Sequence, residues 1–228
     1  VKEAFETLTL GEDKLKRSID LGVGHLQIGV SSTLCKYMLL PYLKDFTKRY
    51  PHINISIVCQ STNESLQMLE ENKIDIGLIG KPENLKNIHF DFLEEIEDIF
   101  VAAKDYLRNL KARGIQKDHI LQSSTLMLLD KNNMTRQYID DYLQENQIII
   151  KDSIDISDMD LLIDFARIGV GVACVIKNFV REDLENGTLM EIPLGFPIHK
   201  REVGFAYKTT TKPSKSLAEF IHFYKTYR

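Results

Sequence analysis

The sequence predicts an α/β protein with two parallel sheets, each in its own lobe. Residues 25–80 alternate the patterns of strand and helix as β-α-β-α-β, and a parallel sheet with right-handed crossovers is the usual result of that order. A similar alternation returns over roughly residues 104–200. The length of 228 residues suits one large domain or two small lobes. The second alternation therefore favours two lobes over one.

Composition and charge narrow the class of protein. Hydrophobic residues make up 43% of the chain and charged residues 27%, as in ordinary globular proteins. The longest apolar stretch covers residues 170–176, far short of the ~20 residues that a membrane helix needs. The net charge is −4, whereas binding to phosphates needs a basic face. We therefore expect a soluble chain with no membrane partner, which does not bind nucleic acid by itself.

The first twenty residues form a short amphipathic segment that glycines 22 and 24 end. Its apolar residues have heptad-like spacing, which is typical of a helix that packs against a partner; they are Phe5, Leu8, Leu15 and Ile19. The chain starts at Val1, not at Met, in this pattern. We therefore expect a fragment whose upstream part is missing.

A series of strands and helices follows. Alternation predicts a strand over residues 25–30, and the next periodic stretch predicts a helix over 34–50 that Pro41 kinks or splits. A strand over 53–57, a helix around Leu66 and Leu69 and a nearly all-apolar strand over 74–80 complete the first lobe's series. Polar residues fill its two strand-to-helix junctions, Ser31-Ser32-Thr33 and Ser61-Thr62-Asn63.

The second half repeats the alternation after a long acidic connection. Apolar and periodic patterns predict strands at 99–103, 125–129, 148–150 and 169–176, and helices at 106–113 and 136–145. Ser157 should open a further helix, with Asp160 three residues on as in a capping box. The lone strand 203–207 and the closing helix 217–224 should return to the first lobe, because no further strand follows them.

Enzymatic motifs are absent from the sequence. It has no P-loop, no G-x-G-x-x-G and no G-x-S-x-G motif, and its six histidines never fall at metal-ligand spacing. The scattered Cys35, Cys59 and Cys174 do not suit a disulfide framework or a zinc site. They favour buried, reduced thiols in a cytosolic protein. The sequence therefore predicts no enzyme, no catalytic residue, no metal and no cofactor.

With enzymatic motifs absent, the polar residues at the starts of the predicted helices are the remaining candidates for a binding site. Four of them stand at or near strand-to-helix junctions: residues 31–33, 61–63, 133–135 and 157–158. In a parallel sheet these junctions lie at the carboxyl ends of the strands, where α/β sheets bind ligands, and helix N-termini favour anions. Each hydroxyl could instead be only a helix cap. Four junctions in two lobes predict a shared cleft for a small acid or a sulfate-like ligand.

Several phrases, in order, resemble the effector-binding domain of LysR-type transcriptional regulators. They are Gly24-His25-Leu26-Gln27-Ile28-Gly29, Ser32-Thr33, Leu40-Pro41, Phe46 with Tyr50-Pro51, Ile74-Asp75-Ile76-Gly77-Leu78, Phe165-Ala166-Arg167-Ile168-Gly169-Val170-Gly171, Glu185-Asn186-Gly187-Thr188-Leu189, and the closing Phe220-Ile221 with Phe223. The resemblance spans about residue 22 to the end of the chain.

This resemblance implies an α/β, two-lobed fold of the type II periplasmic-binding-protein kind. Each lobe has a mostly parallel sheet flanked by helices, and two crossing strands form the hinge. Residues 1–21 would be the C-terminal part of a linker and dimerisation helix. Residues 22–100 and 204–228 would form regulatory lobe I, and residues 101–203 regulatory lobe II. A winged helix-turn-helix that binds DNA would lie upstream of the chain.

The resemblance also implies the effector-binding residues. Ser32 and Thr33 match hydroxyls after the first strand, Thr62 matches the second junction, and Thr135 and Ser157 match loops of lobe II. The family's glycine- and serine-rich loop before the second-lobe helix is replaced here by residues 132–134, Asn-Asn-Met. That departure weakens the case for anion contact at the loop.

The implied partners are a small-molecule effector, DNA and a second copy of the chain, as a homodimer or tetramer in the bacterial cytoplasm. The self-contact would join the helix with Leu34 to Leu43 to the partner's helix with Leu161 to Phe165, because both have more apolar residues than one covered face requires. The alternative is a solute-binding protein of a transport system, which shares the fold but needs an export signal. An enzyme on this fold is a second alternative, and no nucleophile, metal set or cofactor loop supports it.

Overall fold

The computed structural model describes residues 24–82, 84–131, 133–209 and 212–227, so the predicted linker segment 1–21 lies outside the described residues. The chain divides into two compact units. The first contains the described residues up to 78, those of 84–90 and those from 205 onward; the second contains the described residues of 79–83 and 91–204. No helix among the described residues has the length and apolar character to cross a membrane.

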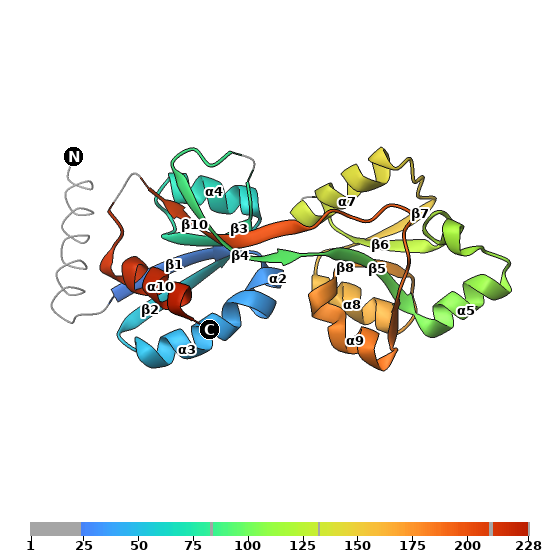
Figure 1. Ribbon diagram of the computed structural model, residues 1–228, viewed down its shortest axis with the longest axis horizontal. Helices are drawn as coiled ribbons and strands as arrows, with labels where there is room; N and C mark the ends of the chain where they lie inside the picture. Colours follow the sequence, from blue (N-terminus) through green and yellow to red (C-terminus); the bar gives the residue numbers. More distant parts are fainter. Residues whose placement is uncertain (1–23, 83, 132, 210–211, 228) are drawn as a thin grey trace, which may run out of the picture. The chain divides into compact units, whose positions relative to one another are not determined.

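The first sheet has the strand order β2-β1-β3-β10-β4. Strand β1 pairs in parallel with β2 and with β3, as the β-α-β-α-β pattern predicts. Helix α4 lies on one face of this sheet, and α3 and α10 lie on the other (Figure 1). The strands are β1 Gly24–Val30, β2 Ile53–Cys59, β3 Ile76–Gly80, β4 Ile88–Ile96 and β10 Arg201–Lys208; the helices are α2 Ser32–Leu34, η1 Cys35–Leu39, α3 Leu40–Arg49, α4 Thr62–Glu70 and α10 Lys215–Thr226.

The helix predicted over residues 34–50 is split, as its proline indicated. A π-helical turn, η1, separates α2 from α3, and Pro41 stands in the first turn of α3, where the missing N–H of a proline costs no hydrogen bond.

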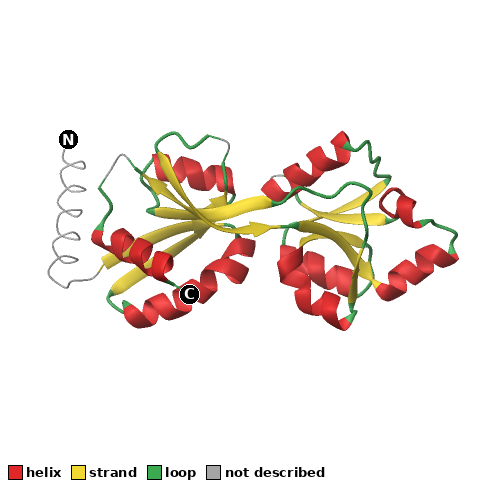
Figure 2. Cartoon of the chain, in the orientation of Figure 1, coloured by secondary structure: helices red, strands yellow, loops and turns green. Residues whose placement is uncertain are grey.

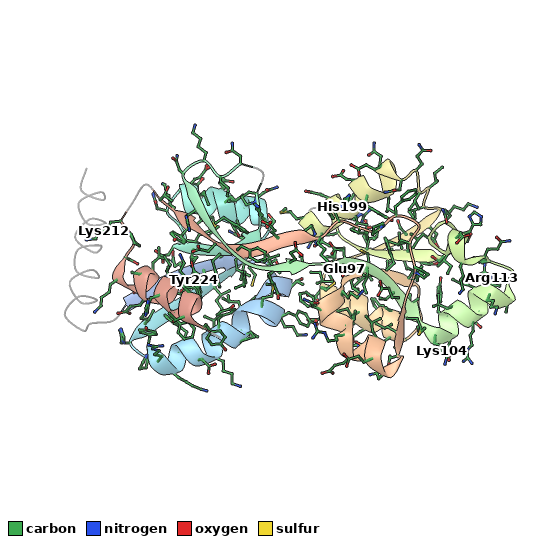
Figure 3. All side chains as sticks on the ribbon, viewed as in Figure 1. Glu97, Lys104, Arg113, His199, Lys212 and Tyr224 are labelled. Atoms are coloured by element: carbon green, nitrogen blue, oxygen red, sulfur yellow. The ribbon has the colours of Figure 1, made fainter. Side chains whose placement is uncertain are left out.

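The core of the first unit contains a cluster of aromatic side chains. Phe46, Phe205 and Phe220 are fully buried, and the ring of Phe220 lies 5.0 Å from Phe46 and 5.4 Å from Phe205 between centroids. Tyr224, labelled in Figure 3, stacks on Phe205 at 4.4 Å. Helix α10 thus joins the end of the chain to the first unit.

The second sheet has the order β7-β6-β8-β5-β9. Strand β6 pairs in parallel with β7 and β8, whereas β5 runs antiparallel to β8 and β9. Helices flank the strands in this unit too (Figure 2). The strands are β5 Asp98–Ala103, β6 Thr125–Leu129, β7 Asp152–Ile156, β8 Val172–Ile176 and β9 Leu189–Glu191; the helices are α5 Lys104–Ala112, η2 Lys117–His119, α6 Ile120–Ser123, α7 Met134–Glu145, α8 Met159–Arg167, η3 Lys177–Val180 and α9 Arg181–Asn186.

Two sequence predictions about the elements are corrected here. The acidic connection contains β4, whose residues alternate between buried and exposed positions only loosely. The strand predicted at 148–150 is wrong: those residues have no regular structure, and the edge strand β7 forms at 152–156 instead. The two units divide after residue 90, and β5 pairs with strands of the second unit.

Candidate functional site

The junction after β1 has hydroxyl side chains in the first turn of its helix. Ser31 caps α2, because its Oγ accepts a hydrogen bond from the Leu34 N–H at 3.2 Å. Ser32 is exposed and Thr33 is partly exposed in the first turn. The first N–H groups of a helix have no partner within that helix, and this first turn contains no acidic residue. Its hydroxyls and amides can therefore donate to an anion.

The junction after β2 already carries a negative charge. Ser61 and Glu64 form a capping box: the Glu64 N–H donates to Ser61 Oγ at 3.3 Å, and the Ser61 N–H donates to Glu64 Oε2 at 2.9 Å. The hydrogen bonds from the backbone and then from the hydroxyl of Ser61 lower the pKa of Glu64. Thr62, partly exposed, follows in the first turn. The Glu64 carboxylate thus takes the place at this N-terminus that a bound anion would take.

The junction after β6 combines a neutral cap with a cation. Asn133 caps α7 by accepting from the Thr135 N–H at 2.9 Å, and the first turn has no acidic residue. The Thr135 hydroxyl accepts a hydrogen bond from the guanidinium of Arg201 at 3.2 Å. Arg201 was not among the predicted site residues, since it stands alone in sequence at the start of β10. Its position beside Thr135 adds a positive charge to this helix start.

Arg201 is held by a buried aspartate. Its Nε donates to Asp98 Oδ2 at 2.8 Å, its Nη2 lies 2.6 Å from the same oxygen in an ion pair, and its guanidinium lies 5.0 Å from the ring centroid of Tyr138. Asp98 is 2% exposed. Burial raises the pKa of Asp98, and the charge and hydrogen bonds of Arg201 oppose that rise. Within the described part of the chain, the second oxygen of Asp98, Oδ1, is buried without a hydrogen-bond partner.

The junction after β7 differs from the prediction. Asp158, not Ser157, caps α8: its Oδ1 accepts from the N–H groups of Asp160 and Leu161 at 2.9 Å and 3.2 Å. Ser157 is exposed and stands one residue before the cap. Asp158 is the N-cap because one of its carboxylate oxygens accepts hydrogen bonds from two backbone amides of the first turn. With Asp160 in the first turn, two carboxylates lie at this helix start.

The predicted residues lie at two neighbouring strand-to-helix junctions in each unit. Val30 and Cys59, the last residues of the parallel strands β1 and β2, are register partners, so Ser32, Thr33 and Thr62 follow neighbouring strand ends in the first unit. Leu129 and Ile156 end β6 and β7 in the same way, and Thr135 and Ser157 follow them in the second unit. Each unit thus presents two neighbouring junctions.

Two further features lie away from these junctions. A cavity of about 640 Å³ in the second unit is lined by α5 and the segment 190–193, and none of the five predicted residues lines it. No group of three or more metal-ligating side chains occurs among the described residues.

Comparison with known proteins identifies the family. The model of the LysR substrate binding domain matches residues 20–228. A curated relative from Bacillus subtilis, the HTH-type transcriptional regulator CysL, is 24% identical over 204 residues, which cover 89% of this chain and 67% of that protein. The chain therefore spans about two thirds of the length of this regulator.

Solved structures show the same fold at low identity. The regulatory domain of Synechocystis CcmR, in complex with 2-phosphoglycolate, aligns with a TM-score of 0.72 at 16% identity and covers 88% of this chain and 95% of its own. The effector binding domain of QuiR, in complex with shikimate, aligns with a TM-score of 0.68 at 17% identity over 88% and 95% of the two chains. The two-sheet architecture is thus of the type II periplasmic-binding-protein kind. With nearly its whole length matched by the family model, the chain belongs to the LysR substrate-binding domain family.

Proposed function

We propose that this domain senses a small anionic effector for a LysR-type transcriptional regulator, in the cleft between lobes that the sequence predicts. One observation carries the proposal: α2 and α7 begin with neutral caps, have hydroxyl side chains and have no acidic residue in the first turn. A helix N-terminus without its own carboxylate favours an external anion.

The five predicted residues differ in their suitability. Ser32 and Thr33 can donate hydroxyl and amide hydrogens together, and Thr135 stands beside the Arg201 cation. Thr62 and Ser157 belong to helix starts where Glu64, Asp158 and Asp160 already supply negative charge. We therefore rank Thr62 and Ser157 as secondary contacts.

The ligands of the two structural neighbours support this chemistry. Shikimate and 2-phosphoglycolate are both small acids, and a binding site for such a ligand needs hydrogen-bond donors more than apolar area. The family model also favours a regulator over a transport solute-binding protein or an enzyme. The domain would bind its effector without chemical change.

In the whole protein, the effector would act on the arrangement of lobes. We propose that the two units are the regulatory lobes, that residues 1–21 continue a linker helix, and that a winged helix-turn-helix upstream binds DNA. A ligand with unequal affinity for two arrangements shifts their populations. The chain would work in the bacterial cytoplasm.

Exposed apolar side chains support pairing of two copies, as a homodimer or within a tetramer. Leu40 on α3 is 49% exposed and Leu161 on α8 is 50% exposed. Phe165, one helical turn after Leu161, is 38% exposed. These are the helices that the sequence predicts for the self-contact, and burying such side chains favours association.

The test of the effector proposal is a thermal-shift screen of small acids and inorganic anions, followed by titration of any ligand found. Ser32→Ala and Thr33→Ala should each weaken binding about tenfold or more, because a hydrogen bond to a charged group is worth about 1.5–3 kcal/mol. Thr47→Ala is the matched control, since its hydroxyl donates to the Leu43 carbonyl within α3. If a ligand binds both variants as tightly as the parent, the assignment to this helix start is wrong.

A further inference from the structure

Two of the three cysteines, 24 residues apart in sequence, meet at the edge of the first sheet. Cys59 is the last residue of the edge strand β2, in register with Val30 of β1. Cys35 opens the π-helical turn η1, and its N–H donates to the Ser31 carbonyl at 2.8 Å. The fold thereby makes the Cys59 thiol a close neighbour of the Cys35 thiol.

The two thiols differ in access. Cys59 is exposed, whereas Cys35 is partly buried. Burial, followed by the neighbouring Cys59, raises the pKa of the Cys35 thiol. An oxidant in solution would therefore reach Cys59 first, with Cys35 held against it. Cys174 lies fully buried in the core of the second unit, which provides an unreactive thiol in the same chain.

Cys35 is the first residue of a π-helical turn. The Leu40 N–H donates to the Cys35 carbonyl in the wide i to i+5 pattern of a π turn, a local irregularity often found at functional positions. The described residues contain no cluster of three or more metal ligands, so the pair is not part of such a cluster. In such a pair the exposed thiol can be oxidised first, and its neighbour can then attack the oxidised sulfur to form a disulfide.

We propose that Cys35 and Cys59 are a reversible thiol–disulfide switch that responds to hydroperoxides. The Cys59 thiolate attacks the outer peroxide oxygen, which gives a sulfenic acid and an alcohol, or water when the oxidant is hydrogen peroxide. The Cys35 thiol then loses its proton and attacks the Cys59 sulfur, and water leaves as the S–S bond forms. Two thiols and one hydroperoxide are thus converted to one disulfide, one alcohol and one water, and a dithiol reductant restores the thiols.

The disulfide would join the end of β2 to the helix that starts at Ser32. It closes a loop of chain through α3 and β2, and such a cross-link stabilises a fold chiefly by restricting the unfolded chain. Oxidation would therefore fix the helix start against the sheet edge. This inference concerns the thiols alone, and its test does not need an effector.

The experiment uses the reduced chain and hydrogen peroxide at a small molar excess. After oxidation, remaining thiols are alkylated with iodoacetamide, and peptides are mapped by mass spectrometry with and without dithiothreitol. We expect a Cys35–Cys59 linked peptide, an intact mass lower by two hydrogens, and recovery of both thiols on reduction. Cys174→Ser, the matched control, should form the same link at an unchanged rate.

Two variants separate the steps. In Cys35→Ser the reaction should stop at the Cys59 sulfenic acid, which dimedone traps, and in Cys59→Ser the peroxide should leave Cys35 unmodified over the same time. The proposal is overturned if the parent chain accumulates sulfinic acid at Cys59 with no linked peptide. It is equally overturned if Cys174 is modified as fast as Cys59.

Discussion

Removing the charge of Arg201 tests the buried ion pair that supports Thr135. In Arg201→Met, the Asp98 carboxylate stays buried at 2% exposure without its cation. Breaking a buried pair by removing one partner costs about 3–5 kcal/mol. For a chain of this size each kcal/mol moves Tm by about 2–4 °C. We expect a Tm lower by about 10 °C, measured by calorimetry and by urea unfolding.

The same variant should depend on pH in a defined direction. Burial raises the pKa of Asp98 in the folded protein, so its ionised form costs stability above that pKa, and the cost is relieved as pH falls through it. Without Arg201 the pKa rises further, and the relief begins at a higher pH. The stability deficit of Arg201→Met should therefore be smaller at about pH 5 than at about pH 8.

Two comparisons control for loss of packing. Arg108→Met removes the same kind of side chain from an exposed pair with Asp105 on α5 and should cost less than about 1 kcal/mol. Asp98→Asn combined with Arg201→Met removes both charges of this pair and should recover much of the loss. A loss below about 1 kcal/mol in Arg201→Met, equal at both pH values, would refute the reasoning.

Two further substitutions probe local packing and capping. Gly171→Ala should destabilise the second unit by about 1–3 kcal/mol in urea unfolding, because a Cβ there would lie 2.4 Å from the Thr125 carbonyl oxygen. Gly195→Ala, with no atom within 4 Å of its Cβ, should change stability by less than about 1 kcal/mol; equal effects at the two glycines would contradict the steric argument. Ser61→Ala should lose about 1 kcal/mol of capping energy. NMR titration should also find the pKa of Glu64 raised part of the way toward its ordinary value, because the backbone N–H of residue 61, the larger cause of the low pKa, still donates while the hydroxyl that also lowers it is lost. An unchanged pKa would show that the hydroxyl has no part in lowering it.

The sequence predicted the parallel core of each sheet because buried strands have clear patterns. Strand β3 is buried along nearly its whole length, and its apolar run is evident. The edge strand β7 is exposed at four of its five positions, and its apolar alternation is limited to Ile154 and Ile156, which is too short to indicate a strand. The neighbouring Ile148 N–H caps the end of α7 at the Leu143 carbonyl, at 2.8 Å. Strand direction is also absent from such patterns, which is why the antiparallel β5 was not expected.

For the site, contacts between residues close in sequence were predictable, and contacts between residues far apart in sequence were not. The cap at Ser31 and the capping box of Ser61 join residues three apart; the sequence predicted a polar helix start at both junctions but did not predict the capping box. The aspartate cap of α8 was missed by one residue, because Ser157 and Asp158 are both good capping residues. Asp98 and Arg201 stand 103 residues apart, and only the sheet brings them together.

The charge at each helix start separates residues that stabilise the fold from residues that can bind a ligand. At α4 and α8 the carboxylates of Glu64 and Asp158 satisfy the first turn from within the chain, so an added anion would gain little there. At α2 and α7 the caps are neutral, and the favourable interaction of an anion with the helix dipole is still available. A ligand that binds only the folded state at about 100 times its Kd adds about 2.7 kcal/mol, which corresponds to a rise in Tm of about 5–10 °C. The thermal-shift screen should therefore detect even a weak effector, and Ser32→Ala should shrink that rise while Thr47→Ala leaves it intact.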